Sequence, residues 1–206
     1  MGDLQIFDLA DLIKKHALTS FVESGTLYGD GLAYAARFNF LELHSIEIVS
    51  SLVEAARKRF IGDKRIEIHS GASMDVLPIL VDELLGPTLF WLDGHFPGGD
   101  ARIADLDAEK DQSTRLPLRS ELEIIAAKRA SAKDYIICDD LWLYEDGPYP
   151  AGSFDAHMQA CFPGKGYSRK TLLGDQTLDF VPGLFQEHNI VKKVDAHQGY
   201  LLIVPK

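Results

Sequence analysis

Acidic side chains stand at the ends of apolar runs in this sequence, where an open parallel sheet would place its chemistry. Ligands of such sheets bind beyond the carboxyl ends of the strands, near the switch point of the strand order. The residues in these positions are Glu23 in "SFVE", Glu47 in "SIEI", Asp93 and His95 in "WLDGH", and Asp139 and Asp140 in "IICDD". We therefore expect them to contribute to one site.

Four ligand-type residues, Asp93, His95, Asp139 and Asp140, end two strands that should lie close together. Oxygen-rich clusters suit Mg²⁺ or Ca²⁺. A hard cation could hold two substrate hydroxyls, lower their pKa and orient one of them for reaction.

Strand and helix patterns alternate along the chain. Strands are predicted over 20–24, 43–49, 65–70, 88–93 and 134–140, and helices over 31–38, 50–60, 73–85 and 117–130. Ser50 is the expected N-cap of the second of these helices, and Pro78 should bend the third or mark a late start. Two further strands, 177–182 and 199–205, are predicted to close the chain. The alternation predicts an α/β fold with a mostly parallel seven-stranded sheet and helices on both faces.

A glycine-rich turn follows the first predicted strand. Glu23 is followed by Gly25, Gly29 and Gly31 in the pattern E-S-G-T-x-x-G-x-G, which differs from the G-x-G-x-x-G of dinucleotide-binding folds. Glycines let the backbone approach a ligand closely, and helix N–H groups then point at it. The acid would repel a pyrophosphate, so the turn suits a ligand with an amino group and a ribose but no phosphate. The alternative is that the glycines only form a tight turn between strand and helix.

From about residue 20 to 140 the chain resembles the class I S-adenosylmethionine (SAM)-dependent methyltransferases, whose first motif has the form E/D-x-G-x-x-x-G. Glu47, 24 residues after Glu23, fills the place of their ribose-binding acid, and "GAS" resembles their adenine-contacting turn, with Met74 able to lie on the ring. Many relatives have Asp where this chain has Ala72. The resemblance implies a Rossmann-like class I methyltransferase fold that binds SAM through Glu23, Gly25, Thr26, Gly29, Glu47, Ile48, Ala72, Ser73 and Asp93.

The acids after the fourth and fifth strands are similar to those of metal-dependent O-methyltransferases that act on sugars of macrolide and aminocoumarin antibiotics, with D-G-D and D-D-Y at these strand ends. "FWLDGHFPGGD" and "LPLRSELEII" also resemble a bacterial group of uncharacterised methyltransferase-like proteins. The resemblance implies Asp93, Asp139 and Asp140 as ligands of Mg²⁺, and His95 with Asp93 as catalytic residues.

His95 stands where the sugar enzymes have the acid expected to be the general base, and it could act as base, metal ligand or hydrogen-bonded loop residue. Asp93 could instead only orient the methionine end of the cofactor, and Asp140 could cap the next segment. The sugar enzymes also have a longer N-terminal portion than the roughly 20 residues that precede the first strand here.

Composition limits the classes of partner. The net charge of −10 argues against nucleic acid and anionic membranes, because phosphate contacts need clustered Lys and Arg. No apolar stretch approaches the roughly 20 residues that span a bilayer, and no signal-peptide core is present, so we expect one domain over 1–206 in the cytoplasm. Cys138 and Cys161 form no C-x-x-C motif, and Cys138 is expected to be an inert buried thiol. The small-molecule acceptor and a homo-oligomeric state stay open.

Three segments outside the strand–helix alternation could cover the site. Residues 1–19 are expected to form an N-terminal helix, and the acidic segment 94–115 a solvated face or mobile lid. Trp142, Tyr144 and Tyr149 could stack on an acceptor but more simply pack in the core. The basic segment 164–170 could meet an acceptor phosphate but more simply is a solvated loop.

The favoured function is methyl transfer from SAM to an oxygen of a small acceptor such as a saccharide or glycosylated metabolite, with possible assistance by a divalent metal. One alternative is a metal-dependent hydrolase or lyase on the same scaffold, and another is a cofactor-binding module without chemistry. Fold does not distinguish them, because sites are grafted on folds.

Overall fold

The structure is a computed structural model that describes residues 3–206. Seven strands form one sheet in the order β3-β2-β1-β4-β5-β7-β6. Their bounds are β1 Ser20–Ser24, β2 Glu42–Glu47, β3 Ile66–Ser70, β4 Thr88–Leu92, β5 Tyr135–Cys138, β6 His188–Lys193 and β7 Tyr200–Pro205. The first five pair in parallel, and β7 runs antiparallel to both of its neighbours. The expected mostly parallel seven-stranded sheet is confirmed.

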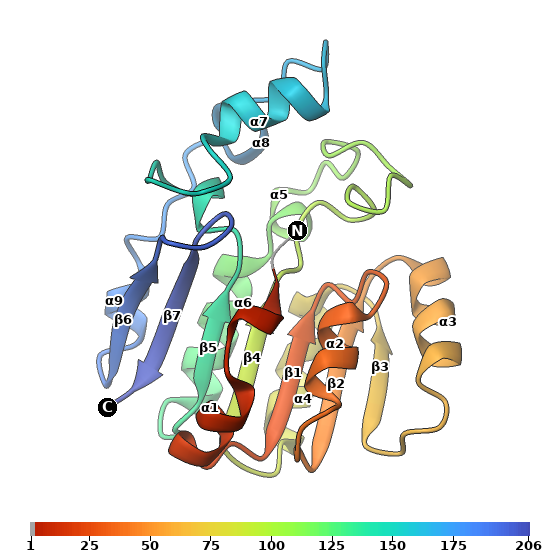
Figure 1. The fold of residues 1–206 in the computed structure, drawn as a ribbon, viewed down its shortest axis with the longest axis vertical. Helices are drawn as coiled ribbons and strands as arrows, with labels where there is room; N and C mark the ends of the chain where they lie inside the picture. Colours follow the sequence, from red (N-terminus) through yellow and green to blue (C-terminus); the bar gives the residue numbers. More distant parts are fainter. Residues whose placement is uncertain (1–2) are drawn as a thin grey trace.

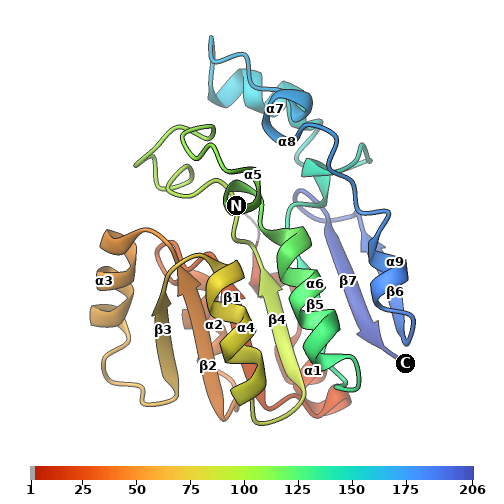
Figure 2. The ribbon, with the colours of Figure 1, turned by 180° about the vertical axis from the view of Figure 1, so that it is seen from behind.

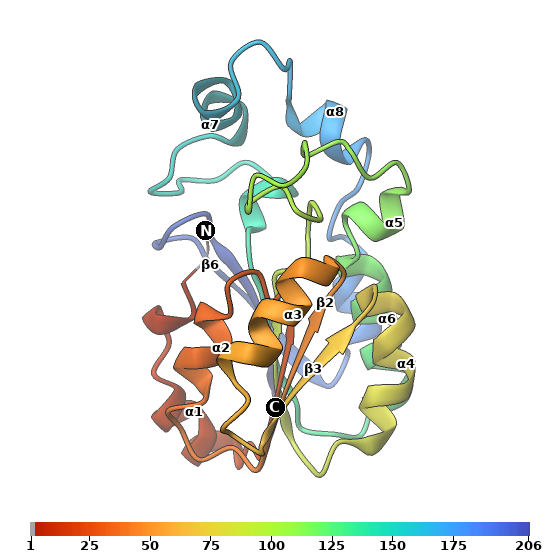
Figure 3. The ribbon, with the colours of Figure 1, turned by 90° about the vertical axis from the view of Figure 1, so that its right-hand side faces the viewer.

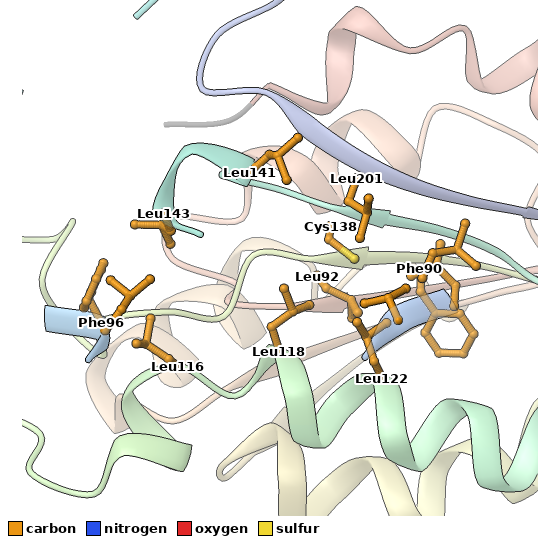
Figure 4. Packing of buried hydrophobic residues seen from close by; sticks show 14 of the residues in the cluster. Phe90, Leu92, Phe96, Leu116, Leu118, Leu122, Cys138, Leu141, Leu143 and Leu201 are labelled. Atoms are coloured by element: carbon orange, nitrogen blue, oxygen red, sulfur yellow. The ribbon is translucent and has the colours of Figure 1, made fainter. Parts of the chain in front are cut away.

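Helices cover both faces of the sheet, so the molecule has three layers (Figures 1, 2 and 3). One face carries α1 Leu9–His16, α2 Asp30–Ala35 and α3 Ser50–Arg59, and the other carries α4 Ser73–Glu83 and α6 Leu118–Arg129. On the α6 face, Leu118 and Leu122 point toward Phe90 of β4 and Cys138 of β5 (Figure 4). Burial raises the pKa of the Cys138 thiol, in keeping with the inert thiol expected there.

The prediction of a strand over 177–182 is wrong. This segment turns into the short helix α9 Val181–Leu184, where Pro182 lies in the first turn. The sixth strand is instead "HNIVKK", β6, which pairs only with β7 at the edge of the sheet. An edge strand needs little burial, so β6 can be polar. Its sequence therefore lacks the apolar run by which the other strands were predicted.

Smaller differences concern helix ends. Val49 is the N-cap of α3 and Ser50 is its first residue, so the predicted cap is wrong by one position. Pro78 lies inside α4 without ending it. In place of one N-terminal helix over 1–19, the described residues form a short 3₁₀ turn, Leu4–Ile6, followed by α1; residues 1–2 lie outside the description.

A cap lies beyond the carboxyl ends of the parallel strands (Figure 1). It contains α5 Gln112–Arg115, α7 Phe154–Cys161 and α8 Arg169–Leu173, and is joined to β5 through the 3₁₀ turn Leu141–Leu143. Trp142 and Tyr149 are buried in its base, as expected for packing residues, whereas Tyr144 is half-buried and borders a small cavity with His95. Among the described residues, no helix is both long and apolar enough to cross a membrane.

A buried ion pair fixes the opposite, amino-terminal edge of β4 and β5. Asp134 accepts hydrogen bonds from Arg129 Nε (2.7 Å) and from the backbone N–H of Thr88 (2.8 Å). Arg129 also donates to the carbonyl of Gly86 at 2.7 Å. The two side chains are only 9% and 3% exposed. The pair therefore joins the end of α6 to the starts of two central strands.

We predict that Arg129→Ala lowers the free energy of unfolding by about 3–5 kcal/mol, because it leaves the Asp134 carboxylate buried without its partner. Lys110→Ala, which removes an exposed ion pair with Asp107, should change it by less than about 1 kcal/mol. Urea unfolding of the three proteins measures both values. Equal losses in the two variants would show that the buried pair does not anchor these strands.

Candidate functional site

Backbone hydrogen bonds that continue the sheet past its strands align the carboxyl ends of neighbouring strands. Gly71 N–H donates to Glu47 O, Gly25 N–H to Ile46 O, Asp93 N–H to Ser24 O and Asp139 N–H to Leu92 O, at 2.9–3.1 Å. These bonds connect the carboxyl ends of five adjacent strands. The predicted site residues therefore meet along one edge of the sheet.

The glycine turn between β1 and α2 approaches the loop after β4 closely. Gly25 has φ +85°, and a Cβ there would lie 2.6 Å from the backbone oxygen of Asp93. Gly31 faces the Glu23 carboxylate, which leaves no room for a side chain. Gly29, also at positive φ, is the N-cap of α2 and packs against Phe60. Gly25 and Gly31 thus shape the cavity described below, whereas Gly29, also predicted to bind cofactor, supports the turn from outside it.

Glu47 ties the glycine turn to β2. One of its carboxylate oxygens accepts the backbone N–H of Leu27 at 2.9 Å, and the other accepts that of Val49 at 2.8 Å. The side chain is 6% exposed and lines the cavity. Since each carboxylate oxygen can accept a second hydrogen bond, the residue is held in place and can still bind a pair of hydroxyls.

Glu23 ends a buried chain of hydrogen bonds. It accepts from Ser45 Oγ at 2.6 Å, and Ser45 Oγ is 2.6 Å from Thr26 Oγ1. Burial raises the pKa of Glu23 to about 8, although the Ser45 hydrogen bond opposes the shift. The hydroxyl of Thr26 is thus part of the wall, and Glu23 is largely protonated at neutral pH.

A cavity of about 370 Å³ opens above these residues, which is within the usual range for small-molecule sites. Of the predicted cofactor residues, all except Gly29 line it: Glu23, Gly25, Thr26, Glu47, Ile48, Ala72, Ser73 and Asp93. Met74, expected near the adenine, is not among the lining residues.

Apart from His95, the ionisable residues with a strong charge preference in the cavity wall are acids. The acids that line it are Asp3, Glu23, Asp30, Glu47, Asp93 and Asp100, whereas no Lys or Arg between residues 3 and 206 does so. Asp3, Asp30 and Asp100 were not predicted as site residues, although Asp30 lies within the quoted glycine turn and Asp100 ends "FWLDGHFPGGD". A cavity of this kind favours a cationic ligand over one with a phosphate.

His95 lies between two carboxylates at the rim of the cavity. Its Nε2 is 3.0 Å from Asp140 Oδ2 and its Nδ1 is 3.4 Å from Asp93 Oδ1. Burial lowers the pKa of His95, but the hydrogen bond and charge of Asp140, with the charge of Asp93, outweigh it and raise the pKa to about 10. Burial has the opposite effect on a carboxyl group and raises the pKa of Asp93 to about 7. In this arrangement the imidazole ring is protonated at neutral pH and can donate from both nitrogens.

Asp139 lies next to this cluster but is not one of the residues whose ligand atoms gather there. Its Oδ1 accepts the backbone N–H of Asp140 at 2.7 Å, and its Oδ2 is buried without a hydrogen-bond partner among the described residues. Asp140 has φ 52°, in the left-handed region. The three ligand-type residues that gather are therefore Asp93, His95 and Asp140, with His95 in the place predicted for Asp139.

This cluster fits a divalent cation in number and spacing. One ligand atom from each of Asp93, His95 and Asp140 lies within 4.8 Å of the others, and Asp140 Oδ1 is buried without a partner. Two carboxylates and one imidazole suit Mn²⁺, Fe²⁺ or Zn²⁺ better than Mg²⁺, which prefers oxygen ligands.

Glu121 of α6 is a buried acid next to the site that sequence analysis missed. It is 1% exposed and lies with His95 and Asp139 around a small internal cavity. Burial raises its pKa to about 7, against the hydroxyls of Ser73 and Ser24, which lower it. The helix sequence "LRSELEII" does not single out Glu121 as a buried acid, because an acid between apolar positions normally lies on the solvent-facing side of a helix.

Comparisons with known proteins agree on the fold. No protein-family model and no curated protein matches the sequence. The whole chain superposes on 80% of a methyltransferase from Podospora anserina bound to S-adenosylhomocysteine (SAH), with TM-score 0.60 and 17% identity. It also superposes on 82% of an O-methyltransferase from Bacillus cereus in complex with SAH, with TM-score 0.62 and 14% identity. A third match, the O-methyltransferase of tomaymycin synthesis from Streptomyces achromogenes with SAM, has TM-score 0.55 and 16% identity over 95% of this chain and 76% of that one. The chain has the Rossmann-like class I methyltransferase fold.

The raised pKa of Glu23 gives a prediction about stability. Between its ordinary value near 4.5 and about 8, the native protein holds a proton that the unfolded chain releases. This group therefore makes the free energy of unfolding fall as pH rises through that range, by up to about 1.4 kcal/mol per pH unit. Glu23→Gln, which stays neutral, should flatten the decline in urea unfolding measured from pH 5 to 8.

The control is Glu54→Gln on the exposed side of α3, which removes an equivalent carboxyl without changing the cavity. Its profile should run parallel to that of the unsubstituted protein. A Glu23→Gln profile that is equally parallel would show that Glu23 is ionised in the native state.

Proposed function

We propose that this protein transfers the methyl group of SAM to an oxygen of a small hydroxylated acceptor, such as a saccharide. The observation that carries the proposal is the cavity wall at the carboxyl edge of the sheet, with its acids and its lack of Lys and Arg between residues 3 and 206. SAM carries a sulfonium and an ammonium group and no phosphate, so it suits this wall. Nucleotides and other phosphate-bearing ligands do not.

On the donor side, Glu47 accepts the two ribose hydroxyls, held by the backbone of Leu27 and Val49. The glycine turn approaches the methionine part of the ligand, where Glu23 and Asp93 meet its positive groups. Ile48, Ala72 and Ser73 line the end of the cavity assigned to adenine. Because Ala72 has no acceptor in its side chain, adenine contact there depends on Ser73 and the backbone.

On the acceptor side, Asp93 and His95 handle the proton. A new bond forms between the acceptor oxygen and the methyl carbon as the carbon–sulfur bond breaks, its electron pair stays on sulfur and SAH is left. Asp93 takes the proton of the hydroxyl, and His95, paired with Asp140, stabilises the negative charge that develops on the oxygen. A divalent cation held by Asp93, Asp140 and a neutral His95 would replace the imidazole proton, bind the acceptor hydroxyls and lower their pKa. Positioning of donor and acceptor contributes the rest.

The donor assignment predicts that SAH raises the melting temperature, since a ligand that binds only the native state stabilises it, by about 2.7 kcal/mol at a hundred times its Kd. Glu47→Ala should remove most of this shift, because the ribose hydroxyls lose their acceptor. Glu47→Gln, which keeps one acceptor oxygen, should remove less. Calorimetry with the exposed-site variant Glu54→Ala as control gives the affinities. Absence of SAH binding at millimolar concentration in the unsubstituted protein would exclude a methyltransferase and favour the hydrolase or lyase alternative.

The acceptor assignment predicts that His95→Ala and Asp93→Asn each lower turnover by about 10²–10⁴-fold, the usual loss for a group that moves a proton. His95→Ala should leave SAH affinity nearly unchanged, because its role lies on the acceptor side. The assay is transfer of labelled methyl from SAM to a panel of polyols and glycosides, with and without Mn²⁺ or a chelator, and with His16→Ala as a control outside the cavity. Full turnover in His95→Ala would remove this residue from the mechanism, and a large loss of SAH affinity would move it to the donor side.

A further inference from the structure

A second cluster of ligand-type residues lies away from the cavity, on strands β2 and β3. His44 is paired in register with Glu67, and Ile46 with His69, so the three polar side chains share one face of the sheet. Ile46 packs against α4 on that face, so the cluster lies at the open edge of the α4 layer, where β3 is the last strand (Figure 3). None of the three residues lines the cavity.

The two imidazole rings face one another at the spacing expected for a shared metal. His44 Nδ1 is 3.1 Å from His69 Nε2. Two nitrogens bound to one tetrahedral Zn²⁺ at about 2.0–2.1 Å are separated by about 3.3–3.4 Å. A shift of a few tenths of an ångström would therefore place both lone pairs on a common ion. The side chains of His44 and His69 are 12% and 20% exposed, so packing restricts both rings.

Two glutamates complete the arrangement. Glu67 Oε2 is 3.9 Å from His44 Nδ1, and this side chain is 66% exposed, so it can move the short distance to become a third ligand. On the other side of the ring, His44 Nε2 is buried without a hydrogen-bond partner, 3.6 Å from Glu42 Oε2. Metal-bound histidines usually donate their second N–H to a carboxylate, which fixes the tautomer and the ring. Glu42 is held in place for this role by Ser20 Oγ and by the backbone N–H of Leu85.

We propose that His44, His69 and Glu67 bind a Zn²⁺ ion, with Glu42 orienting His44. Two imidazoles and one carboxylate are ligands that Zn²⁺ accepts, and the exposed side of Glu67 leaves the fourth position to water. The ion would link the edge strand β3 to β2, with the exposed Glu67 on the side of the ion that faces solvent. This site is independent of methyl transfer and of any metal at Asp93, His95 and Asp140.

The experiment is Zn²⁺ titration of the metal-free full chain by calorimetry, first with the other cluster disabled and then with both disabled. Asp93→Asn with Asp140→Asn should keep one Zn²⁺ site. Adding His44→Asn and His69→Asn to that protein should remove the site, with at least a hundredfold fall in affinity. Co²⁺ in place of Zn²⁺ should give the visible absorption of a tetrahedral ion in the first variant only.

Single substitutions test the arrangement in a protein that keeps both histidines. Glu42→Gln should weaken Zn²⁺ binding by about 10–100-fold, the usual cost of losing an orienting carboxylate. Glu83→Gln, a nearby carboxylate for which the described residues show no ion pair with either ring, should have little effect. Loss of Zn²⁺ binding in the Asp93 and Asp140 variant, or its persistence after both histidines are also replaced in that variant, would overturn the proposal. So would equal effects of Glu42→Gln and Glu83→Gln.

Discussion

The site depends on backbone hydrogen bonds that extend the parallel sheet by one residue past β1, β3, β4 and β5. Gly25 N–H to Ile46 O and Asp93 N–H to Ser24 O bring the glycine turn directly against the loop after β4. That contact is possible only because Gly25 has no side chain to collide with the Asp93 carbonyl. These hydrogen bonds fix the loops that carry Glu23, Glu47 and Asp93, so the three carboxyl groups stay close together. The fold therefore imposes both the repulsion between them and the cost of removing them from water.

This imposed charge explains how the site can select its ligand. Burial raises the pKa of Glu23 and of Asp93, so the apo protein carries protons where a carboxylate would be costly. A bound cation stabilises the ionised form of Glu23 and Asp93. The cavity therefore binds positively charged ligands in preference to neutral or negative ones. Glu47 differs, because two backbone N–H groups compensate its carboxylate and leave it available as a hydrogen-bond acceptor. One wall thus provides both charge selection and hydroxyl binding.

The sequence predicted what depends on local pattern. Apolar runs and helical spacing predicted the five parallel strands, their helices and the acids at the strand ends. These elements place the cavity at the carboxyl edge of the sheet. Side-chain direction could not be predicted, because it depends on tertiary neighbours: His95 lies between Asp93 and Asp140, and Asp139 accepts the backbone N–H of Asp140. Glu121 and β6 were missed for the same kind of reason, since a buried acid on a helix and a polar edge strand both contradict the usual pattern and are specified only by their tertiary neighbours.

The two charged segments that looked separate in the sequence are partners in the structure. In the acidic segment, Asp105 accepts from Lys165 at 2.8 Å and Asp107 accepts from Tyr167 Oη at 2.8 Å. The exposed Asp105–Lys165 pair contributes little, because solvent screens it. The stronger attachment is apolar, since Leu106 and Tyr167 are both buried in the core cluster that continues into β4 and β5. Segment 94–115 is therefore anchored to the cap through Leu106, while most of its charged residues between 100 and 113 are exposed, as expected for a solvated face. Because its first residues, from Gly94 to Gly98, also line the cavity, the cap and the acceptor side of the site are built from the same stretch of chain.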